Sequence, residues 1–168
     1  QCDVNNNLIA GSAPPFTSAI RNTFFGCGAG ASTTSCSNNT AIGYNTLSTQ
    51  TIGGGGNVAI GDNALAVYDN GQYSTAVGYL SQQANEDGEE NVSVGFNTLA
   101  ALTDGGRNTV IGNRAASALT GIAANSELNV VMGFGALENS VSSSVNIAIG
   151  WAAMNASSCT QCIGIGRQ

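Results

Sequence analysis

The sequence predicts an all-β fold, a parallel β-roll or β-solenoid with nine coils of about 17 residues. Three observations support this prediction. A five-residue phrase ending in glycine recurs nine times, its residues alternate between β-branched and small, and the stretches between phrases are rich in turn-forming residues. Similar phrases at a nearly constant period are the sequence signature of a solenoid, in which each repeat stacks on its neighbours.

The phrase usually opens with asparagine, as in Asn39–Gly43, Asn91–Gly95 and Asn146–Gly150, and it degenerates in the last copy, Thr160–Gly164. Asparagine at the start of the phrase and glycine at its end argue against a helix of the same period. The closing glycines lie at positions 26, 43, 61, 78, 95, 112, 133, 150 and 164, so that successive spacings are 17, 18, 17, 17, 17, 21, 17 and 14.

Each phrase is predicted to form a short strand. Its second and fourth residues, such as Thr40 and Ile42, share one face, and the small third residue, such as Ala41, faces the other way. We expect the β-branched face to belong to the apolar strip of the coil. The small, smooth face is then expected to meet another subunit, because nine coils of it are too apolar to leave in water.

A second pattern follows five of the glycines and ends in leucine or methionine, as in Tyr44–Leu47, Phe96–Leu99 and Trp151–Met154. We interpret it as a second short strand or turn whose leucine closes the apolar strip. The rest of each period, for example Ser48–Gly56, has the composition of a loop.

The chain divides into an N-terminal segment, residues 1–21, and a solenoid repeat domain, residues 22–168. We interpret Asn7–Gly11 as a degenerate first coil, and Pro14–Pro15 interrupts any strand ladder there. The segment is therefore expected to cap the solenoid or to contact another subunit.

Composition excludes several classes of function. Four basic against ten acidic residues give a net charge of −6, which disfavours nucleic acid as a partner. The absence of histidine and lysine removes the commonest general base, metal ligand and Schiff-base residues, so we expect no enzyme, no cofactor and no metal site. No apolar run is long enough for membrane insertion. A chain that starts at Gln1 and has five cysteines suggests a processed, extracellular protein.

The order Asn-Thr/Val-Ala-Ile-Gly followed by x-x-Ala-Leu resembles the head-domain repeats of trimeric autotransporter adhesins and related repeats of viral and phage tail fibres. The resemblance covers about residues 22–166. It implies a left-handed parallel β-roll, three chains side by side, and attachment to a host surface protein or glycan. The repeat here is longer than in the adhesin heads, so its loops are longer.

The residues that follow the closing glycines include a broken row of aromatics. Such a row could stack on sugars or grip a partner, or it could fill the coil corner or an intersubunit seam. Acidic residues gather in loops, and the segment Asn85–Glu90 offers oxygen ligands for calcium but lacks the spacing of an EF-hand, which favours a solvated loop. The aromatic residues are Tyr44, Tyr79, Phe96, Phe134 and Trp151.

The cysteines are expected to form two local disulfides, Cys27–Cys36 and Cys159–Cys162, leaving Cys2 as a candidate for a bond between chains. A zinc site is the rival, but the two pairs lie at opposite ends of the predicted rod. Three asparagines, Asn38, Asn91 and Asn155, begin glycosylation sequons.

These features predict an extracellular structural and adhesive fibre module that forms a homo-oligomer and displays loops for cell adhesion or other surface attachment. The alternative is a filament subunit joined end to end, in which the N-terminal segment pairs with the last coil of the next copy. An ice-binding solenoid fits less well, because threonine alternates with valine at the second strand position. Asp62 is the one acidic residue within the strand pattern, which argues against a glycosidase-like pair.

Overall fold

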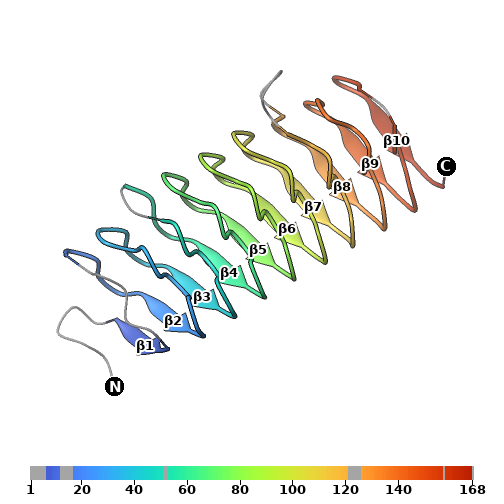
Figure 1. Ribbon diagram of the computed structural model, residues 1–168. Helices are drawn as coiled ribbons and strands as arrows, with labels where there is room; N and C mark the ends of the chain where they lie inside the picture. The colour runs from blue at the N-terminus through green and yellow to red at the C-terminus, as the bar shows by residue number, and fades with distance from the viewer. Residues whose placement is uncertain (1–6, 12–16, 51–52, 121–125, 157, 168) are drawn as a thin grey trace.

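The protein is a β-solenoid, seen here in a computed structural model that describes residues 7–11, 17–50, 53–120, 126–156 and 158–167. Ten strands form one parallel sheet in the order of the sequence, β1 to β10. Figure 1 shows them side by side along one wall of an elongated molecule, with each coil returning through a corner and a longer loop. The predicted all-β solenoid is confirmed, and equivalent positions of neighbouring coils are about 17 residues apart, as for Asn91 and Asn108.

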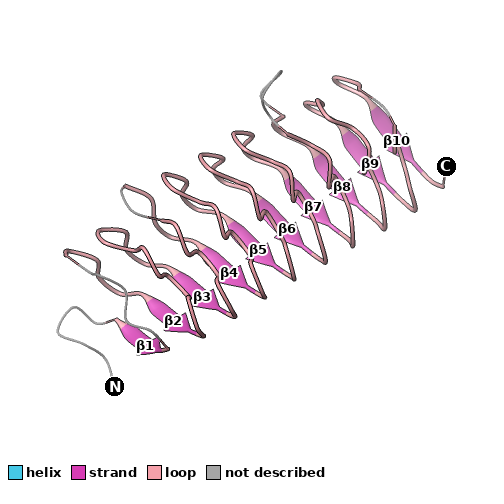
Figure 2. Cartoon of the chain, viewed as in Figure 1, coloured by secondary structure: helices cyan, strands magenta, loops and turns pink. Residues whose placement is uncertain are grey.

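Each strand is three residues long, and the described residues include no helix (Figure 2). β1 pairs with β2, so the degenerate first coil expected at Asn7–Gly11 joins the sheet. The strands are β1 (Leu8–Ala10), β2 (Thr23–Phe25), β3 (Thr40–Ile42), β4 (Val58–Ile60), β5 (Thr75–Val77), β6 (Val92–Val94), β7 (Thr109–Ile111), β8 (Val130–Met132), β9 (Ile147–Ile149) and β10 (Ile163–Ile165).

The two faces of the strands are the reverse of the expected arrangement. The small middle residues, such as Ala41 and Ala59, are fully buried inside the coil. The flanking residues point outward, and Ile42 is 38% exposed. The coil is too narrow for two β-branched rows, because the residue after the corner, usually a leucine such as Leu47 at 0% exposure, already fills the space beside the alanine column.

A polar layer divides this narrow core into two apolar clusters. One cluster runs from Phe24 to Ala76 and the other from Leu99 to Ala153. In the coil between them, Gln82 replaces the leucine, and its Nε2 donates to Ser93 Oγ at 2.8 Å. The Gln82 Oε1 accepts from Asn85 Nδ2 at 2.9 Å. The layer therefore interrupts the apolar column while its polar groups satisfy one another.

The glycine after each strand is required both by its backbone conformation and by the next coil. The closing glycines have φ values between 123° and 149°, where a side chain is strained. A Cβ on Gly95 would also lie 2.8 Å from the carbonyl carbon of Gly112. Consecutive corners thus approach at a distance that only glycine permits.

A buried asparagine ladder connects successive coils. The side chain of Asn108 makes four hydrogen bonds: its Nδ2 donates to Asn91 Oδ1 (3.0 Å) and to the Ser126 carbonyl (2.7 Å), and its Oδ1 accepts from the backbone N–H (3.1 Å) and Nδ2 (2.9 Å) of Asn129. Each asparagine therefore joins the strand of its own coil to a loop and to the neighbouring coil. Ser74 takes this position in the coil of β5.

The register of the last coil differs from the expected one. Gly164 pairs with Ala148 in the middle of the strand, and Gly166, not Gly164, stacks on Gly150. Cys162 occupies the asparagine position, where its N–H donates to Asn146 Oδ1 at 2.9 Å. The inward position selects Gly164, because a Cβ there would lie 2.4 Å from Met154 Cγ.

We expect the substitution Asn108→Ala to lower the free energy of unfolding by about 3 kcal/mol, because it leaves several buried donors and acceptors without partners. Urea denaturation followed by circular dichroism measures the change. Asn139→Ala is the matched control, since the Asn139 side chain bonds Asn155 at an exposed site, and it should change the value by less than about 0.5 kcal/mol. Equal effects of the two substitutions would contradict a stabilising role of the ladder.

Candidate functional site

The most extensive candidate surface is formed by the first and third residues of the strands, which we call the outer strand face. These residues lie in two rows along the sheet, one containing Thr23 and the other containing Phe25. Members of the rows with large exposed side chains are Leu8, Phe25, Ile42, Ile60, Val92, Val94, Ile111, Val130, Met132, Ile147, Ile163 and Ile165.

The outer strand face carries no charge, and threonine is its one polar residue type. The exposed parts of its large apolar side chains amount to on the order of 1,000 Å², more than the roughly 300–600 Å² of the largest patch on a typical monomer. The sequence singled out these residues, but the expectation that they form the core was wrong. The face open to a partner is the β-branched one.

The aromatic row adjoins this surface, because each of its members lies two residues after a strand. All five members, Tyr44, Tyr79, Phe96, Phe134 and Trp151, are between 42% and 58% exposed, so they do not fill the interior of the coil. The Tyr79 and Phe96 rings stack with centroids 5.8 Å apart, and the Arg167 guanidinium lies 4.8 Å from the centroid of the Trp151 ring. Two predictions for the aromatic row stay open, namely a seam between chains and a ligand-binding row.

The polar residues that interrupt the aromatic row hold the corners together. Asp62 Oδ1 accepts the Tyr44 N–H at 3.1 Å, and Asn113 Oδ1 accepts the Phe96 N–H at 3.0 Å. Asp62 is thus a partner of the backbone of the preceding coil.

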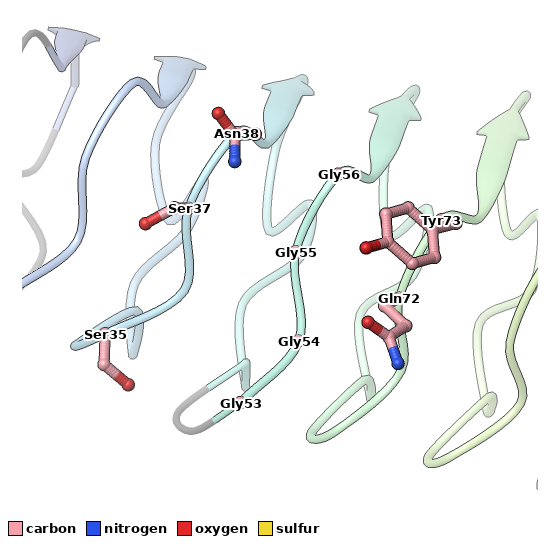
Figure 3. Close-up of a pocket in the computed structure, with 9 residues that line it drawn as sticks. All are labelled: Ser35, Ser37, Asn38, Gly53, Gly54, Gly55, Gly56, Gln72 and Tyr73. Atoms are coloured by element: carbon pink, nitrogen blue, oxygen red, sulfur yellow. The ribbon is translucent and has the colours of Figure 1, made fainter.

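A groove opens on the loop side of the solenoid, where one coil has the run Gly53–Gly56. Its volume is about 500 Å³, and its two banks are the coils on either side, with Ser37 and Asn38 on one bank and Gln72 and Tyr73 on the other (Figure 3). We call it the glycine groove, and no sequence pattern considered above predicted it. Four consecutive glycines in one copy of the repeat were the signal that could have revealed it.

The acidic loop Asn85–Glu90 does not gather its oxygen atoms around one point. Asp87 accepts from Asn70, Glu89 accepts from Gln72, and Glu90 pairs with Arg107 at 2.9 Å. No group of three cysteine, aspartate or glutamate side chains placed to hold a metal ion occurs among the described residues. The carboxylates instead join neighbouring loops.

The cysteines form one of the two expected disulfides. Cys159 and Cys162 are bonded, and the loop they close is held by Asn146, whose side chain contacts the backbone of both. The pairing of Cys27 with Cys36 was wrong. Cys27 lies exposed at a corner and Cys36 is buried in the loop before β3, and neither is bonded to another described cysteine. Cys2 lies outside the described residues.

Two of the three sequons are constrained by the fold. Asn91 is fully buried in the asparagine ladder and is not available to a glycan. Asn155 is partly buried, and its Oδ1 accepts from Asn139 Nδ2 at 2.8 Å. Asn38 is exposed, on the bank of the glycine groove.

Comparison with known proteins gave no relatives. No family model, no curated protein and no solved structure matches the chain. The described part of the chain contains no helix with the length and hydropathy needed to cross a bilayer. Any assignment of function therefore depends on the surfaces described above.

The two cysteines Cys27 and Cys36 should differ sharply in reactivity. Burial raises the pKa of the Cys36 thiol, so less of the reactive thiolate is present at any given pH, and the side chain is also shielded from reagent. With iodoacetamide at mildly alkaline pH, peptide mapping should find Cys27 alkylated first and Cys36 protected until denaturant is added. Similar rates for both thiols in the folded protein would contradict this placement.

Proposed function

We propose that the chain is an extracellular structural and adhesive fibre module, which associates laterally with copies of itself and displays its loops for surface attachment. The observation that carries the proposal is the outer strand face, an uncharged apolar surface along the sheet. Apolar patches of this size on soluble proteins are typical of interaction sites.

A second copy of the same chain is the partner that fits this surface best. Two identical solenoids side by side carry the same rows at the same spacing, about 4.8 Å from strand to strand, so their side chains keep one relative register along the whole length. No charged group has to be desolvated, which suits the core of an interface. The resemblance to trimeric adhesin heads favours three parallel chains.

The loops, in contrast, carry most of the charged and amide side chains and supply the attachment side of the proposal. Glu90, Arg107 and Glu127 form a network across three successive loops. A rigid rod that presents variable polar loops is a suitable scaffold for surface recognition, because loop residues change without disturbing the ladder. The role we propose is non-catalytic. The Cys159–Cys162 disulfide supports a location outside the reducing cytosol.

The double variant Ile60→Arg/Val94→Arg tests self-association. Both side chains are more than one third exposed, so arginine there should leave the fold intact while opposing a charge-free interface. Sedimentation velocity should show an oligomer for the wild-type protein, three chains under the favoured arrangement, and single chains for the variant.

Val141→Arg is the matched control, because Val141 is 54% exposed but belongs to a loop away from the outer strand face. It should sediment like the wild-type protein. A monomeric wild-type protein at micromolar concentration, or a double variant that keeps its oligomeric state, would overturn the proposed assembly.

A further inference from the structure

We propose that the glycine groove is a binding site for a neutral saccharide. This inference rests on the proposed attachment role of the loops and gives that role a ligand class, but it does not depend on self-association. The groove lies on the loop side and is built from residues that the outer strand face does not use.

The groove exists because one coil departs from the repeat. Gly56 precedes the ladder residue Asn57, and the same position in the neighbouring coils carries Asn38 and Tyr73, both with φ near 60°. The repeat therefore does not require glycine at position 56. Gly53 has open space where a side chain would begin, with no other atom within 4 Å of the position that a Cβ would take. Gly53 instead has a φ of 85°, a conformation that favours glycine, and Gly56 is adjacent to the ring of Tyr73 from the next coil. Contact between the stacked backbones therefore accounts for neither glycine.

The missing side chain at position 56 makes room for an aromatic ring. A Cβ on Gly56 would lie 2.9 Å from Tyr73 Cδ1, so the ring of Tyr73 occupies the place that a side chain would fill. Figure 3 shows the ring reaching from its own coil toward the glycine coil with its hydroxyl leading. Tyr73 is 64% exposed, the largest value among the described aromatic residues. Its ring offers an open face for the C–H surface of a sugar, with the hydroxyl beside it for hydrogen bonding.

Polar groups flank this ring without adding charge. Gln72 Nε2 donates to Glu89 at 2.9 Å, which directs Gln72 Oε1 toward the glycine coil as an acceptor (Figure 3). Asn38 supplies an exposed amide on the opposite bank. Ser37 Oγ already accepts the Ile20 N–H, so it serves the fold.

The lining of the groove determines the class of ligand. Amides, hydroxyls and glycine backbone line it, together with one aromatic ring, and no charged side chain does. Hydroxyl groups match the amides and the tyrosine hydroxyl, whereas an anionic ligand would find no cation. A volume of about 500 Å³ is within the roughly 300–1,000 Å³ range of small-ligand sites.

The test is a glycan array of neutral, sialylated and sulfated oligosaccharides, probed with wild-type protein and three variants. Tyr73→Ala removes the ring, and Gly56→Asn fills the groove with a residue that the coil of Asn38 accepts at a similar φ. Leu128→Ala is the matched control, since Leu128 has the same coil position, a φ of 58° and 50% exposure. We expect binding to one or more neutral glycans, weakened at least about tenfold by the first two variants and unchanged by the control.

Nuclear magnetic resonance titration of the wild-type protein with the best neutral glycan keeps the test decisive if a variant misfolds. Signals of the Tyr73 ring and the Gly53–Gly56 amides should shift first. Binding of no neutral glycan, binding of charged glycans alone, or shifts confined to other loops would overturn the site. A wild-type protein that binds the glycan as a monomer would reject the proposed assembly and leave the site standing.

Discussion

Successive coils of this protein must stack at backbone contact distance, and the rest of the structure depends on that constraint. Parallel strands of three residues offer few hydrogen bonds each, so the ladder needs further contacts between coils. The closing glycines supply one set, since a Cβ at Gly95 would meet the backbone of Gly112. The buried asparagines supply the other set, because the side chain of Asn108 forms hydrogen bonds with Asn91 and Asn129 of the two neighbouring coils. Together they hold successive coils in contact along the sheet.

Close stacking also decides what the inside of each coil holds. A short coil with a tight corner has room for a column of alanines and a column of leucines, as Ala59 and Leu65 show. Valine and isoleucine at the flanking strand positions are therefore directed outward. An apolar exterior is thus a consequence of a narrow interior, and it provides the surface on which the proposed self-association depends.

The loops differ from one another because the ladder does not constrain them. The coil of Gly53–Gly56 has glycine at the position where its neighbours carry Asn38 and Tyr73. The coil of Gln82 has a polar side chain in its interior, whereas the coils on either side have Leu65 and Leu99. Both departures leave the stacked corners intact. The saccharide site proposed at the glycine groove would consequently occupy one coil of a scaffold whose regularity is preserved elsewhere.

The sequence by itself determined the repeat, the parallel order, and the strands and glycine corners of all but the last coil, because each depends on local spacing that recurs through the chain. The spacing breaks down in the last coil, where Gly166 and not Gly164 closes the strand. Tertiary structure alone decided which strand face points inward. Alternation shows that a strand has two faces, but which of them points inward depends on the width of the coil. Leu47 and its equivalents, which lie in the turn after the strand, fill part of the interior. The same holds for cysteine pairing: Cys159 and Cys162 close a short loop, whereas Cys27 and Cys36 lie on a corner and in the interior. The glycine groove could likewise be found only in the tertiary structure. Its two banks belong to the coils before and after the glycine coil, and stacking brings these three loops side by side.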